Sequence, residues 1–131
     1  MKKALLFVEL MKSYYPDKRI ILTGHSMGAA FSSYCGIKND FDVINFNGMG
    51  LTRRLVKKLS HEKNECHILH INSRHDWLSQ FVQKLFLVQV GERVLLTRFG
   101  GHALAYRSET GDNIFLCNEM LNENHEGKHT V

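Results

Sequence analysis

Residues 19–28 read RIILTGHSMG, and the fold of the chain is decided by this stretch. RIILT, residues 19–23, is a short continuous apolar run, typical of a strand buried on both faces of a parallel sheet. GHSMG, residues 24–28, follows at once, and apolar residues at helical spacing continue beyond it. The stretch therefore predicts a strand that turns sharply into a helix, with Ser26 at the turn.

The same alternation extends to both sides of this stretch. We expect a helix over residues 2–15, ended by Pro16. Further strands are predicted at 41–46, 66–72 and 93–99, and further helices at 51–63, 77–86 and about 112–122. This alternation predicts an α/β fold with a doubly wound, mostly parallel sheet of about four strands. Residues 1–121 are expected to form a single domain, and residues 122–131 a polar tail.

The composition is that of an ordinary globular protein. Hydrophobic residues make up 44% and charged residues 23% of the chain, enough for one buried core. A net charge of +4 does not argue for a nucleic-acid partner, and 3 cysteines suit a reducing compartment. The apolar start resembles a signal peptide, but Glu9 ends it early, and no run is long enough to span a membrane. We therefore expect a cytoplasmic protein without a transmembrane segment.

GHSMG is the kind of turn that exposes a serine nucleophile to substrate. A serine hydroxyl is a poor nucleophile until a base takes its proton, and a serine on a strand-to-helix turn stands clear of the sheet. Gly24 and Gly28 are expected to omit side chains where the strand and the helix crowd together. The backbone N–H of Met27, at the helix start, can donate to a developing oxyanion. The alternative is a turn of Ser and Gly without chemical meaning, since GxSxG also occurs by chance.

Two residues beyond Ser26 complete a Ser-His-Asp set. Asp76 follows the third predicted strand and His102 follows the fourth, so both lie at the same sheet edge as Ser26. In these roles His102 removes the proton of Ser26, and Asp76 orients the imidazole and stabilises its charged form. The alternatives are a helix N-cap for Asp76 and a polar loop position for His102.

IILTGHSMGAAFSSY, residues 20–34, resembles the nucleophile segment of the class 3 lipases, an α/β-hydrolase family. FDVINFNGMG, HINSRHDW and GGHALAY are similar to that family's next strand, its aspartate-bearing strand and the region of its catalytic histidine. The resemblance implies Ser26 as nucleophile, Asp76 as acid, His102 as base and the Met27 N–H as oxyanion donor. It is nearest to the compact intracellular branch, because the interval from Asp76 to His102 is short.

The resemblance departs from the family at the front of the chain. Members of the family have several strands before the nucleophile strand, and one loop there supplies a second oxyanion donor. The printed sequence starts at the helix before RIILT, so we expect a truncated hydrolase fold and weak ester hydrolysis. We also expect self-association through an exposed edge of the strand at 19–23.

Other aromatic and histidine residues have weaker claims to a role. Trp77, Phe81 and Phe99 lie near the predicted site and are candidates to line an acyl pocket or to pack in the core. His67 and His70 resemble a metal-ligand spacing, but strand alternation sends them to opposite faces, and no metal or other cofactor is expected.

The sequence therefore predicts a serine hydrolase of lipase or carboxylesterase type, acting on a small ester or lipid. Two alternatives stay open. One is a thioesterase or acyltransferase with the same triad, and the other is a catalytically impaired hydrolase fragment that acts as a partner-binding module.

Overall fold

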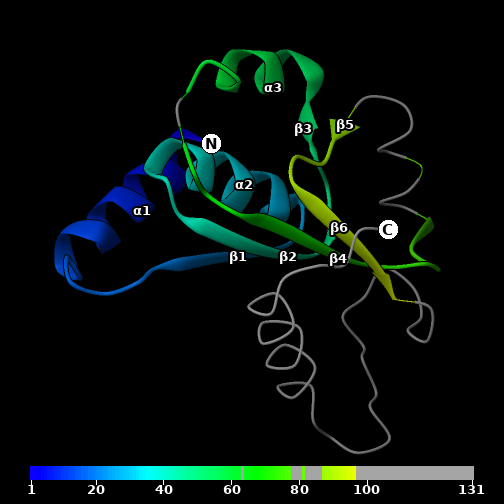
Figure 1. Ribbon diagram of the computed structural model, residues 1–131, viewed down its shortest axis with the longest axis horizontal. Coiled ribbons are helices and arrows are strands. Elements are labelled where there is room, and N and C mark those ends of the chain that lie inside the picture. Colours follow the sequence, from blue (N-terminus) through cyan, green and yellow to red (C-terminus); the bar gives the residue numbers. More distant parts are fainter. Residues whose placement is uncertain (63, 78–80, 82–86, 97–131) are drawn as a thin grey trace, which may run out of the picture.

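The computed structural model describes residues 1–62, 64–77, 81 and 87–96 of the chain (Figure 1). Its helices are α1 (Lys2–Tyr14), α2 (Met27–Asn39) and α3 (Arg53–Leu59). Its strands are β1 (Ile21–Ser26), β2 (Asp42–Gly48), β3 (Leu51–Thr52), β4 (Ile68–Ser73), β5 (Leu87–Val88) and β6 (Glu92–Leu96). The predicted helix at about 112–122, the polar tail and all but residues 77 and 81 of the helix predicted at 77–86 lie outside the described residues.

The main sheet has the strand order β1-β2-β4-β6, and every neighbouring pair in it is parallel. These are the four strands predicted at 19–23, 41–46, 66–72 and 93–99, so the α/β class and the parallel four-strand sheet are confirmed. A second, antiparallel ribbon of β3 and β5 was not predicted. Leu51 and Thr52 were assigned to a helix, but the Thr52 side chain accepts a hydrogen bond from the Leu55 backbone N–H at 3.3 Å. This N-cap starts α3 at Arg53 and leaves Leu51 and Thr52 extended.

The three described helices lie over one face of the main sheet (Figure 1). α2 packs on β1 and β2, and α1 packs on the outside of α2. The core between helices and sheet is built from Ala30, Ile37, Val43, Leu51, Leu59 and Ile68. The described elements therefore share one core.

Strand β1 lies at an edge of the sheet. Within the described part of the chain, its backbone pairs with β2 alone. Ile21 and Thr23 are exposed and Leu22 is half-buried, so the prediction that this strand is buried on both faces is wrong for these residues. The reason is that the described helices cover only one face.

Helix α1 is apolar on more than one side. Val8 is buried, whereas four large apolar side chains stay exposed: Leu6, Phe7, Leu10 and Tyr14. Among the described helices, none has the length and apolarity that a membrane span requires.

Candidate active site

Ser26 stands at the junction where β1 passes directly into α2. β1 ends at Ser26 and α2 begins at Met27, so no loop separates them. The backbone of Ser26 has φ 54° and ψ −123°. A positive φ of this kind is uncommon for a residue with a side chain and costs of order 1–3 kcal/mol. Such strain persists only where the surrounding structure imposes it, and it gathers at functional sites.

Gly24 and Gly28 differ in why each position holds glycine. A Cβ on Gly24 would collide with the backbone carbonyl of Gly28, so the first turn of α2 packs directly on the β1 backbone. A Cβ on Gly28 would meet nothing within 4 Å. The expected crowding therefore requires glycine at position 24 only, because the contact is made by the Gly28 carbonyl and not by its Cα hydrogen.

The N-terminus of α2 has the electrostatics that an oxyanion needs. The helix has 13 residues, its first turn holds no acidic residue, and the Ser26 side chain makes no capping bond to it. The positive end of the helix dipole and its first amides therefore face the Ser26 turn without an opposing carboxylate in that turn. The predicted donor, the backbone N–H of Met27, belongs to this end.

Asp76 lies beyond the end of β4, and its side chain is fully buried. The turn that carries it is anchored on Ser73. The Asp76 backbone N–H donates to the Ser73 carbonyl at 3.1 Å, and the His75 N–H donates to the Ser73 hydroxyl at 3.2 Å. Aspartates are almost never fully buried unless they are paired. The burial of Asp76 therefore favours a carboxylate that interacts with other buried groups over a helix N-cap at the surface.

The Ser26 and Asp76 turns share one edge of the sheet. Both follow the carboxyl ends of parallel strands, with β2 between them. Ser26 pairs with Gly48 at the end of β2, and the Met49 N–H donates to the Ser26 carbonyl at 2.8 Å. On the other side, the Ser73 N–H donates to Asn47 Oδ1 at 2.7 Å. A continuous set of hydrogen bonds therefore joins the two turns.

The remaining predicted residues fall into two groups. His102 and Phe99 lie outside the described residues. Trp77 and Phe81 are 71% and 59% exposed, so neither packs in the core.

Buried polar side chains beneath the site were missed by sequence reasoning. Asn45, Asn47 and Asn72 are almost fully buried, and so are His70 and Ser73. The signal was present in the sequence, because INFNG and HINS place polar residues inside otherwise apolar strands. Polar side chains at strand positions facing a core need hydrogen-bond partners. Asn45 finds them on α2, whereas Asn47 and Asn72 find them on neighbouring segments.

His70 is a buried histidine within this polar layer. Its Nε2 lies 3.2 Å from the Val90 carbonyl, whereas Nδ1 has no hydrogen-bond partner among the described residues. The pKa of His70 is lowered from 6.5 to about 4, chiefly by burial. The Val90 bond opposes this shift, and the charge of Arg93 adds to it. The imidazole is therefore neutral at neutral pH. His67 is exposed, which agrees with the prediction that the two histidines do not share a face.

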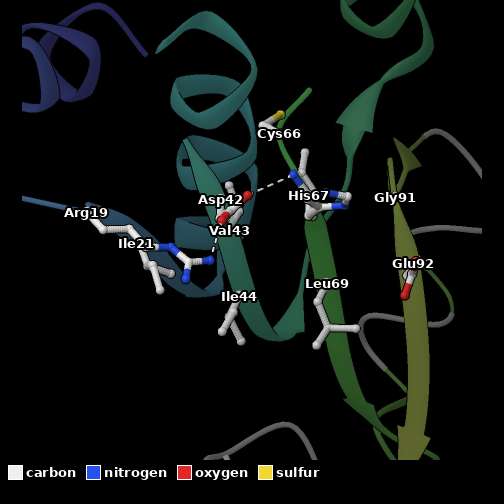
Figure 2. A pocket seen from close by; sticks show the side chains of 11 residues that line it. Arg19, Ile21, Asp42, Val43, Ile44, Cys66, His67, Leu69, Gly91 and Glu92 are labelled. Atoms are coloured by element: carbon white, nitrogen blue, oxygen red, sulfur yellow. Dashed lines mark hydrogen bonds and ion pairs between the residues drawn. The ribbon is translucent and has the colours of Figure 1, made fainter. Parts of the chain in front are cut away.

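A separate groove of about 510 Å³ lies at the amino ends of the strands (Figure 2). Its floor is formed by Ile21, Ile44 and Leu69, which project from three neighbouring strands. At its rim, Arg19 Nη2 lies 2.8 Å from Asp42 Oδ2, and the hydrogen bond from Arg19 lowers the pKa of Asp42. The groove is at the opposite end of β1 from Ser26, so it is not part of the candidate active site.

No protein-family model and no curated protein sequence matches the chain. The resemblance to the class 3 lipases therefore stays an interpretation of the residues quoted above. Within the described ranges, no three His, Cys, Asp or Glu side chains gather closely enough to hold a metal ion.

Proposed function

We propose that the chain is a serine hydrolase that cleaves carboxylic esters through an acyl-enzyme on Ser26. The observation that carries the proposal is the strained backbone of Ser26, with φ 54° and ψ −123°, directly between a parallel strand and a helix. A nucleophile held in this way projects above the sheet edge, next to the positive end of a helix. The buried carboxylate of Asp76 at the same edge supports the proposal.

The proposed reaction has two halves. Ser26 Oγ attacks the ester carbonyl while His102 takes its proton, and the resulting oxyanion accepts a hydrogen bond from the Met27 N–H. The C–O bond to the alcohol then breaks, and His102 returns the proton to the leaving oxygen. In the second half, water attacks the acyl-enzyme by the same route and releases the acid. Asp76 holds the imidazole in the tautomer that both halves need.

Two other functions remain candidates. A thioesterase or an acyltransferase uses the same residues and differs only in the leaving group or the acceptor, so the described site supports it equally. A partner-binding module with little activity is favoured by different observations: among the described residues β1 has one strand neighbour, and α1 exposes Leu6, Phe7 and Leu10.

A fluorophosphonate probe and a short p-nitrophenyl ester test the proposal together. We expect the probe to label Ser26 covalently and the protein to hydrolyse the ester. Ser26→Ala should abolish both, whereas Ser13→Ala, on the exposed side of α1, should abolish neither. Ester hydrolysis that survives Ser26→Ala would contradict the proposal, and a wild-type protein that shows neither activity would favour the partner-binding alternative.

A further inference from the structure

The tripeptide Asn47-Gly48-Met49 lies between the two turns of the candidate active site and bonds to both. On one side, Gly48 pairs with Ser26, and the Met49 N–H donates to the Ser26 carbonyl at 2.8 Å. On the other side, Asn47 Oδ1 accepts from the Ser73 N–H at 2.7 Å. Ser73 in turn accepts the backbone bonds that shape the Asp76 turn. Asn47 and Gly48, the last residues of β2, and Met49 directly after it therefore connect the Ser26 turn to the Asp76 turn.

Asn47 is suited to this position by its backbone as well as its side chain. Its φ is 43°, in the left-handed region that asparagine tolerates better than most residues. Its side chain is fully buried, so the bond from Ser73 does not compete with water. The left-handed step turns the chain at the end of β2, so that Asn47 reaches toward β4 while Met49 reaches toward β1.

A closed set of side-chain bonds holds the middle of the tripeptide. The Gly48 N–H donates to Asn72 Oδ1 at 3.1 Å. Asn72 Nδ2 donates to Gln89 Oε1 at 3.0 Å, and Gln89 Nε2 donates back to the Gly48 carbonyl at 2.7 Å. Both backbone groups of Gly48 are therefore bonded to side chains that come from two other segments. This bracing keeps the tripeptide from shifting along either strand.

We propose that Asn47, with the Asn72 and Gln89 pair that holds Gly48, positions Ser26 and Asp76 relative to each other for the proposed hydrolysis. The inference rests on the proposed function. Asn47 touches no reacting atom in this account; it acts through the two turns. A displacement of about 1 Å between catalytic groups can cost about 10²-fold in rate, so the loss should appear in kcat and leave substrate binding intact.

Four variants test this positioning role. Asn47→Gly removes the acceptor of the Ser73 bond but keeps the left-handed backbone. Asn47→Asp restores an acceptor oxygen at the same length and also tolerates a positive φ. Asn45→Ala is the matched control, because Asn45 is equally buried on the same strand but bonds to Ser33 and to the Ala29 carbonyl under α2. Gln89→Ala removes the bonds from Gln89 to Asn72 and to the Gly48 carbonyl, and Gln89 is only half-buried.

The readouts are kcat and KM for a p-nitrophenyl ester, measured where circular dichroism shows each variant to be folded. We expect Asn47→Gly to lower kcat by about 10- to 100-fold with KM within about twofold. Asn47→Asp should lie within about fivefold of the wild type, and Asn45→Ala should keep the wild-type kcat even if it melts at a lower temperature. If Asn47→Gly does not fold, Gln89→Ala carries the test, with the same requirement that kcat falls and KM does not change.

Several results would overturn the inference. These are an unchanged kcat in Asn47→Gly, a loss confined to KM, an equal loss of kcat in Asn45→Ala, or no recovery in Asn47→Asp. If the wild-type protein is active and all four variants have its kcat and KM, this inference is overturned and the proposed function is not. A wild-type protein that neither reacts with a fluorophosphonate nor cleaves esters overturns the proposed function and this inference with it.

Discussion

At the scale of single residues, Ser26 combines a reactive hydroxyl with an unfavourable backbone. Two other described residues with a side chain have a positive φ, Asp40 and Asn47, and both are of types that tolerate the left-handed region. Serine has no such tolerance. The strain at Ser26 therefore needs another reason, and access of the hydroxyl to substrate is the one that the proposed function supplies.

Replacing Ser26 by glycine should stabilise the protein while it removes the nucleophile. Glycine adopts this φ without steric cost, so strain of order 1–3 kcal/mol is relieved, less about 1 kcal/mol for the greater freedom of glycine in the unfolded chain. Ser26→Ala keeps a Cβ and the strain, and serves as the control. Urea denaturation should show Ser26→Gly to be more stable than Ser26→Ala by about 1 kcal/mol. If Ser26→Gly is instead less stable than Ser26→Ala by about 1 kcal/mol, the turn holds no strain.

His70 should make the stability of the protein depend on pH below neutrality. Burial lowers its pKa from 6.5 to about 4, so the unfolded chain binds a proton more readily than the folded one. The stabilisation is complete above pH 6.5 and is lost as the pH falls from 6.5 to about 4, by up to about 3 kcal/mol. His70→Gln retains a donor for the Val90 carbonyl and should lack this loss. Denaturation curves of the wild type and His70→Gln at several pH values measure this loss. If the free energy of unfolding depends on pH equally in both proteins, His70 is not the cause.

At the scale of elements, the contact between β1 and the start of α2 determines the shape of the site. The Gly28 carbonyl sits directly against Gly24, and this approach turns the chain with no loop between strand and helix. The dipole of α2 then points at the residue that makes the turn. A looser contact would move the helix N-terminus away from Ser26.

Alanine at the two elbow glycines should have opposite effects on stability. Gly24→Ala places a Cβ against backbone atoms of Gly28 and Ala29, which cannot give way as a side chain does. We expect a loss of about 3 kcal/mol or more in the free energy of unfolding. Gly28→Ala meets open space in a helix and should be neutral or stabilising by up to about 1 kcal/mol. Thermal melting of the two variants is the measurement, and similar melting temperatures would contradict this geometry.

At the scale of the whole molecule, one end of the sheet combines a strand edge with an exposed apolar helix. β1 pairs with β2 alone among the described residues, and α1 exposes Phe7 and Tyr14 by 61% and 64%. Strand edges and contiguous apolar surfaces both favour association with another chain. The self-association predicted from the sequence, and the weak hydrolysis predicted with it, stay predictions.

Sedimentation over a range of concentrations should show the chain associating reversibly. Phe7→Glu introduces a charge into the exposed face of α1 and should weaken association at least about tenfold, because a charge buried in an interface must be desolvated. Trp77→Glu changes a residue that is 71% exposed but lies at the carboxyl edge of the sheet, so it should leave association unchanged. A monomer at every concentration, or equal effects of both variants, would exclude this surface as the interface.

The sequence alone determined the order of the principal strands and helices and the Ser26 turn, because these depend on hydropathy spacing and on neighbours within a few residues. It failed at Leu51 and Thr52, where a side-chain cap outweighed apolar spacing, and at Gly28, where a carbonyl makes the contact. Only the tertiary structure decided which strands lie side by side, that Asp76 is buried, and that Asn47 bonds Ser73 from 26 residues away. The physical reason is that a polar residue in a strand shows only that it needs a partner. Which group fulfils that need depends on how distant segments are brought together around the core.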